Sequence, residues 1–166
     1  MTWKPVIRQE GEGERILFKV GLMTFKAASS ETDGHFAFIE TILPPGANVE
    51  PHQHPEAEIF YVLDGEFTFR IGDGPPVICG KGAFLSVPPH VRHAYENHTG
   101  MPGKILGMLA PGGDGGLETF FRQVGVPLKE EDRVPDLSRP VGFLHEEIGR
   151  RRNTNASPKI DGKGQS

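Results

Sequence analysis

The amino-acid sequence predicts an all-β domain, a sandwich or barrel of short strands, and three observations support this. Short apolar runs rich in β-branched and aromatic residues alternate with turn residues between positions 35 and 110. Glycine (22) and proline (15) are both frequent, and they separate these runs instead of forming one low-complexity tract. No helix-length segment lies between consecutive runs, which disfavours parallel βαβ units.

The predicted strands follow one another at close spacing. The run 35–43 stops at a Pro-Pro-Gly turn, and the run 58–63 stops at Asp64-Gly65, a strong hairpin signal. The run 66–71 alternates between apolar and polar side chains, as expected for a strand with one buried face. Further strands are expected at 76–79, 83–87, 92–97 and 104–110.

Helical periodicity begins only after residue 111. Apolar residues recur at i, i+3, i+4 and i+7 from Leu117 to Val124, with Asp114 nearby as a candidate cap. The same spacing recurs more weakly from Val141 to Ile148. We therefore expect short C-terminal helices that pack on the β-domain. The polar end of the chain, 151–166, predicts a disordered tail.

Composition and charge restrict the classes of function. The net charge of −4 argues against a nucleic-acid-binding surface. The lone cysteine, Cys79, excludes an intrachain disulfide and a cysteine-rich zinc site. No apolar run is long enough to span a membrane, and the first residues lack the apolar region of a signal peptide. These features predict a soluble, cytoplasmic protein.

The stretch "EPHQHPEAEIFYVLDG" carries candidate metal ligands. His52 and His54 lie one residue apart, and Glu58 follows four positions later. On a strand, residues i and i+2 face the same side, and a turn at Pro55 would bring Glu58 alongside the two histidines as a hairpin. Two imidazoles and a carboxylate form a ligand set that iron, manganese, nickel or zinc uses.

The alternative is that the two histidines lie on an exposed edge strand by chance and bind no metal. Glu58 argues against this, because it shares the parity of Phe60 and Val62 and is expected to face the interior. A buried, unpaired carboxylate is very costly, and a metal ion would supply a partner. Of the remaining histidines, we expect His90 in a turn, and the others on the surface or in ordinary packing.

A second segment, "GAFLSVPPHVRHAYEN", completes two motifs in a fixed order. The first motif, G-x5-H-x-H-x3-E-x6-G, falls on Gly46, His52, His54, Glu58 and Gly65. The second falls on Gly82, Pro88, His93 and Asn97. Together they resemble the two motifs of the cupin superfamily. One position departs from the pattern, because His90 stands where the family has glycine; histidine tolerates positive φ better than most residues do.

The resemblance implies a double-stranded β-helix, the jelly-roll barrel of cupins. It also implies that His52, His54, Glu58 and His93 hold one divalent transition metal: iron, manganese, nickel, cobalt, copper or zinc. On this basis residues 1–150 form a single cupin domain, with the barrel core at about 15–110 and the helical segment at about 114–150. A homodimer is expected from the family and from the frequency of two-fold symmetric dimers.

Within the superfamily, the chain is similar to small proteins grouped with quercetin 2,3-dioxygenases. The segments that carry this likeness are "HPEAEIFYVLDGEFTF" and "APGGDGGLETFFRQVGVP". The likeness implies a dioxygenase for a small flavonol- or enol-like substrate, with Glu58 as the catalytic base. Two alternatives stay open: another metal-assisted enzyme (an isomerase, decarboxylase or hydrolase), and a non-catalytic metal- or small-molecule-binding protein.

Overall fold

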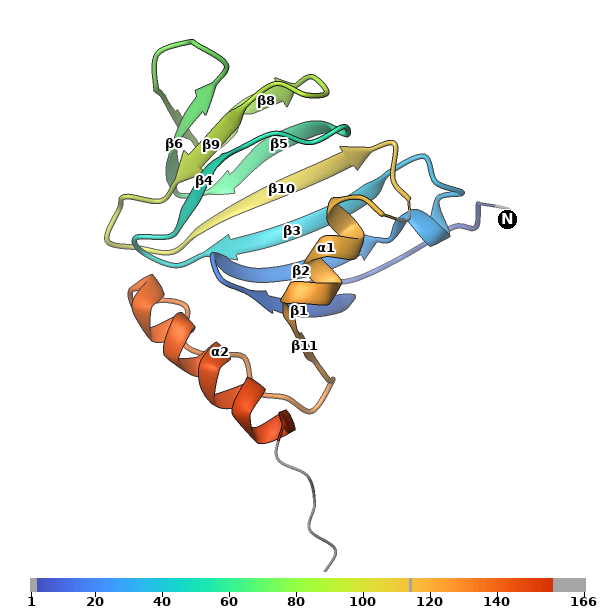
Figure 1. Ribbon diagram of the computed structural model, residues 1–166, viewed down its shortest axis with the longest axis vertical. Helices are drawn as coiled ribbons and strands as arrows, with labels where there is room; N and C mark the ends of the chain where they lie inside the picture. Colours follow the sequence, from blue (N-terminus) through green and yellow to red (C-terminus); the bar gives the residue numbers. More distant parts are fainter. Residues whose placement is uncertain (1–2, 114, 157–166) are drawn as a thin grey trace, which may run out of the picture.

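The computed structural model describes residues 3–113 and 115–156, and these form two antiparallel sheets (Figure 1). The strands of the larger sheet are β1 (Glu14–Phe18), β2 (Gly21–Ala27), β3 (Ala37–Leu43), β5 (Ala57–Asp64), β8 (Phe84–Val87), β10 (Gly103–Ala110) and β11 (Val126–Leu128). The strands of the smaller sheet are β4 (Asn48–His52), β6 (Glu66–Ile71), β7 (Val77–Gly80) and β9 (His93–Glu96). Their spatial orders are β11-β1-β2-β3-β10-β5-β8 and β4-β9-β6-β7.

The main core lies between the inner faces of the two sheets. It is rich in aromatic side chains: the Phe60 ring of β5 lies 5.3 Å from the Phe69 ring of β6 and 5.1 Å from the Tyr95 ring of β9. β3 alternates strictly between buried and half-buried residues, as a strand with one core face should. β2 is buried on both faces, because Leu22 packs in a second apolar cluster with Leu144.

The helices are short and follow the barrel. They are α1 (Leu117–Val124) and α2 (Val141–Ala156), and a single 3-10 turn, η1 (Ser29–Glu31), precedes β3. α1 packs against β1, and α2 packs against β11 (Figure 1). The predicted all-β fold with C-terminal helices is therefore confirmed. Neither helix in the described ranges is long and apolar enough to cross a membrane.

The structure also differs from the sequence predictions. α2 continues to Ala156, so residues 151–156 are helical where we expected a tail; residues 157–166 lie outside the described ranges, as does Asp114. A strand that carries both His52 and His54 was expected, but β4 ends at His52. β1, β2 and β11 were not assigned individually, and β2 lacks the alternation that marks a half-buried strand.

The turn before β9 contains the residue that departs from the family pattern. His90 is exposed and has φ +62°, the left-handed conformation that glycine would adopt most easily. Its N–H donates to the His54 carbonyl oxygen at 2.8 Å. His90 is thus a turn residue that ties the segment before β9 to the segment after β4.

We predict that His90→Val lowers the free energy of unfolding by about 1–3 kcal/mol, because a β-branched residue is strained at positive φ. His90→Gly and His90→Asn should stay close to the wild type, since both residues tolerate this conformation. Denaturant titration measures the effect, with His35→Val, an exposed histidine outside the positive-φ set, as the matched control. Equal stability of His90→Val and the control would contradict the prediction.

Candidate metal centre

His52 and His93 are direct neighbours on two paired strands of the smaller sheet. His52 ends β4 and pairs in register with His93 at the start of β9, and their ring centroids lie 4.3 Å apart. The register between β4 and β9 shifts between Val49 and His52. Such irregularities re-aim side chains, and here the shift places the His52 imidazole beside that of His93.

His54 reaches the same centre from outside a strand. β4 ends at His52, so the expectation that both histidines lie on one strand is wrong for His54. The His54 backbone is held instead by the hydrogen bond from the His90 N–H. The side chain is buried, and its ring centroid lies 5.1 Å from that of His93.

Glu58 comes from the opposite sheet. It lies on β5 and is buried on the same face as Phe60 and Val62, as the parity predicted. The expected hairpin between the His52 segment and β5 is wrong, because β4 pairs with β9 and β5 pairs with β10 and β8. The carboxylate therefore meets the imidazoles across the interior of the barrel.

The four side chains converge on one point. One ligand atom from each of His52, His54, Glu58 and His93 lies within 4.8 Å of the others. The Nε2 atoms of His54 and His93 each lie 3.0 Å from the same oxygen, Oε2 of Glu58. The structure thus brings together all four side chains that the motifs singled out.

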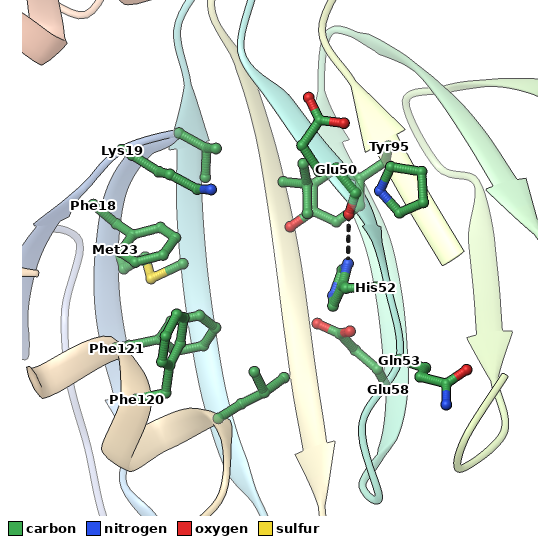
Figure 2. Close-up of a pocket in the computed structure, with 14 residues that line it drawn as sticks. Phe18, Lys19, Met23, Glu50, His52, Gln53, Glu58, Tyr95, Phe120 and Phe121 are labelled. Carbon is green, nitrogen blue, oxygen red and sulfur yellow. Dashed lines mark hydrogen bonds between the residues drawn. The ribbon is translucent and has the colours of Figure 1, made fainter. Parts of the chain in front are cut away.

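Backbone carbonyl groups set the tautomers of two imidazoles. Nδ1 of His52 donates to the Glu50 carbonyl oxygen at 2.8 Å (Figure 2), and Nδ1 of His93 donates to the Val91 carbonyl oxygen at 2.9 Å. A carbonyl oxygen only accepts, so Nδ1 carries the proton in both rings. In a neutral ring, Nε2 is then an acceptor, free to bind a metal.

These four side chains require a positive charge among them. Nε2 of a neutral His93 and Oε2 of Glu58 are both acceptors, and two acceptors 3.0 Å apart in a buried site are unfavourable without a positive charge nearby. A proton on an imidazole or a metal ion can supply that charge. Three imidazoles and one carboxylate are ligands that suit first-row transition metals, so the cluster fits a metal site.

The pKa shifts show how the protein accommodates the charge on Glu58. Burial disfavours its carboxylate, but hydrogen bonds and charge from His54 and His93 hold the pKa of Glu58 below its ordinary value. Burial also disfavours a charged His54, yet Glu58 and the nearby Glu56 raise the pKa of His54. Burial lowers the pKa of His52. The surroundings thus favour a proton on His54 and disfavour one on His52.

A cavity of about 330 Å³ opens onto this cluster (Figure 2). His52 and Glu58 form one side, and Phe18, Phe120 and Phe121 lie on the opposite side. The remaining lining residues are Lys19, Val20, Met23, Val49, Glu50, Pro51, Gln53, Tyr95 and Leu117. The cavity is therefore mainly apolar and aromatic, with polar groups at the candidate metal centre and near Lys19.

Several residues of this site were not predicted from the sequence. Phe120 and Phe121 were predicted to pack as part of a helix, but they line the cavity. Tyr95 does so too, and burial, with the charge of Glu58, raises the pKa of its phenol so that it keeps its proton. Glu56 is buried beside His54. In the sequence, Glu56 differed from its neighbours only as an acidic residue between two predicted ligands, His54 and Glu58.

The raised pKa of His54 predicts opposite effects of pH on the metal-free and the metal-loaded protein. A raised pKa stabilises the folded state below the unfolded pKa of about 6.5, and this contribution is lost as pH rises through the folded value. A metal competes with the same proton, so its stabilisation should grow over that range.

We therefore expect the melting temperature of the metal-free wild type to fall as the pH rises above 6.5. The melting temperature of metal-free His54→Asn should fall by less over the same range. The rise in melting temperature on adding Ni(II) should become larger over the same pH range. Differential scanning fluorimetry across a pH series measures both quantities. A nickel-induced shift that is independent of pH would contradict a site at which metal displaces a proton.

Comparison with known proteins agrees with this geometry. Residues 39–109 match the family model described as "Cupin domain". Quercetin 2,3-dioxygenase of Bacillus subtilis (strain 168) is 35% identical over 124 residues, which are 74% of this chain and 35% of that protein. An "H2HPP isomerase" of Bacillus subtilis is 30% identical over 79 residues, 48% of this chain and 32% of that protein. The chain thus spans about a third of the length of each curated relative.

The solved structures show the same fold. An RmlC-like cupin from Shewanella frigidimarina superimposes with a TM-score of 0.56 at 19% sequence identity, over 67% of this chain and 94% of that one. This confirms the jelly-roll arrangement of the two sheets. From the sequence match, the shared fold and the converging histidines and glutamate, we conclude that the chain belongs to the cupin superfamily and resembles its quercetinase-like members.

Proposed function

We propose that this protein is a metal-dependent dioxygenase acting on a small substrate with a flavonol- or enol-like pair of chelating oxygens. One observation carries the proposal: a mainly apolar cavity with an aromatic wall of Phe18, Phe120 and Phe121 opens onto two of the four candidate ligands, His52 and Glu58. A planar substrate held there would place its oxygens at the cluster. The similarity to quercetin 2,3-dioxygenase supports the same assignment.

His52, His54, Glu58 and His93 would hold one divalent transition metal. Such a metal would supply Lewis acidity toward the substrate oxygens and the one-electron chemistry that reactions with dioxygen require. Three imidazoles and one carboxylate leave room for further ligands on a six-coordinate ion. The ligand set suits iron, manganese, nickel, cobalt, copper and zinc, and only zinc lacks redox chemistry of its own for a reaction with dioxygen.

Glu58 is the proposed catalytic base. Its carboxylate lines the cavity and is held ionised, so it can accept a proton from a substrate hydroxyl. A carboxylate with a low pKa is a weak base, and this matches an acidic hydroxyl, such as that of an enol or a flavonol, better than an aliphatic alcohol. Tyr95 keeps its proton and offers an O–H donor on the cavity wall.

The aromatic wall would position the ring system of the substrate and exclude water. Phe18 packs edge-on against Phe121 at 5.4 Å and against Phe120 at 5.9 Å. Edge-on packing of this kind leaves ring faces and edges available to a planar guest. Lys19, at the far side of the cavity from Glu58, adds a cation that can interact with a polar substituent (Figure 2).

An isomerase is the second candidate, favoured by the 30% identity to the "H2HPP isomerase". The same base and metal centre can move a proton between carbon and oxygen of an enol without dioxygen. Oxygen consumption separates the two candidates. A homodimer and a cytoplasmic location remain predictions of the family resemblance and of the composition.

The test measures dissolved oxygen and flavonol absorbance together, after metal-free protein is reconstituted with Fe(II), Mn(II) or Ni(II). We expect oxygen uptake in step with flavonol loss for at least one metal. Glu58→Gln should lower kcat by about 10²–10⁴-fold, the usual contribution of a positioned base. The metal content of each sample is measured alongside, so that loss of the base is distinguished from loss of the ion.

Conversion of an enol substrate under strictly anaerobic conditions would favour the isomerase. An absence of turnover with every metal and substrate would contradict both enzymatic candidates and favour a binding protein.

A further inference from the structure

Glu56 is a buried carboxylate that the proposed mechanism does not use. It lies between two candidate ligands in the sequence, and only 8% of its surface is exposed. Its two oxygens point to two different partners. Oε1 accepts a hydrogen bond from the Leu117 N–H at 2.9 Å, and Oε2 lies 3.2 Å from Nδ1 of His54.

The first partner is the start of α1. The N–H groups of a first helical turn lack partners within the helix, and a carboxylate there is favourable for hydrogen bonding and for the helix dipole. The residue before the helix, Gly116, offers no side chain to do this. Glu56 supplies the acceptor from the barrel, and Leu117, Phe120 and Phe121 of the same helix line the cavity.

The second partner is the side of His54 that faces away from the cluster. Nε2 of His54 points to the centre, 3.0 Å from Glu58. If Nε2 binds a metal, Nδ1 must carry the proton and needs an acceptor. Nδ1 of His54 and Oε2 of Glu56 are both buried, and neither has a hydrogen-bond partner among the described residues. A small rotation of either side chain would pair them.

We propose that Glu56 is a positioning residue that couples the metal centre to α1: one oxygen orients His54 for metal binding, and the other holds the helix that walls the cavity. This inference rests on the metal centre of the proposed function but not on a reaction with dioxygen. Metal binding would tighten the docking of α1, and by reciprocity a docked α1 would favour metal binding.

Glu56→Gln tests the need for two acceptors in one side chain. Glutamine has nearly the same shape, but it has one acceptor oxygen and one NH2 group. The Leu117 N–H and the His54 Nδ1–H both require acceptors, so glutamine can serve only one of them. We expect the affinity for Zn(II), measured by chelator competition, to fall about 10- to 100-fold, as is usual when the outer partner of a ligand is lost.

Gly116→Ala displaces the same carboxylate without changing its chemistry. An alanine Cβ at this position would lie 2.0 Å from Oε1 of Glu56, whereas the φ of −94° is acceptable for alanine. The carboxylate would have to move, and we expect weaker Zn(II) binding. Gly142→Ala is the matched glycine control, since nothing lies within 4 Å of its Cβ position.

Hydrogen exchange of the α1 amides, with and without Zn(II), measures the coupling. Zn(II) should slow exchange at 117–121 in the wild type and leave it unchanged in Glu56→Gln. Glu118→Gln is the control for general loosening of the helix, because Glu118 anchors α1 by accepting a hydrogen bond from the Ser29 N–H, away from the cluster. In that variant we expect faster exchange, a Zn(II) affinity reduced by less than in Glu56→Gln, and a slowing of exchange by Zn(II) that is retained.

Side-chain NMR of ¹⁵N-labelled histidine supplies a readout that a purely structural role would not affect. In the Zn(II)-loaded wild type, the His54 Nδ1–H should be protected and shifted downfield, and Glu56→Gln should lose this signal. Glu56→Gln that binds Zn(II) as tightly as the wild type would overturn the role of Glu56 alone. Wild-type protein that binds no Zn(II) would overturn the metal centre, and the coupling with it.

Discussion

A buried carboxylate among imidazoles is the constraint on which the site depends. Glu58 lies in the barrel interior, and the Nε2 atoms of two histidines face one of its oxygens at 3.0 Å. Two of the three imidazoles direct their Nδ1 protons outward, to the carbonyl oxygens of Glu50 and Val91. Acceptors therefore accumulate at the centre, and a cation is needed to balance them. The protein can bind a proton there, or a metal can replace it.

The jelly roll brings these groups together from both of its sheets. β4 and β9 place two imidazoles side by side on one sheet, and β5 directs the carboxylate from the other. The same interior continues into a mainly apolar cavity that α1 lines on one side. Because Glu56 contacts both His54 and the start of α1, the centre and the cavity wall are physically connected. A change at the metal centre is then expected to affect the position of α1 in the cavity wall.

The sequence predicted the fold class and all four converging side chains, because spaced motifs and the alternation of β5 are local signals. The hairpin between the His52 segment and β5 was wrong, since a local pattern does not reveal which sheet each strand joins. His90 was expected in a turn, and the structure shows that it adopts φ +62° there. Glu56 was missed because its partner Leu117 lies 61 residues away, a contact that only the folded chain creates.

The converging side chains imply that this barrel holds a transition metal on His52, His54, Glu58 and His93. Metal content by mass spectrometry, on protein purified without chelators, tests this most directly when compared with a His52→Ala/His54→Ala double variant. The account predicts a near-stoichiometric transition metal in the wild type and its loss in the double variant, with the far-ultraviolet circular dichroism of both proteins unchanged. A folded wild type that contains no metal and takes none up on reconstitution would contradict the account.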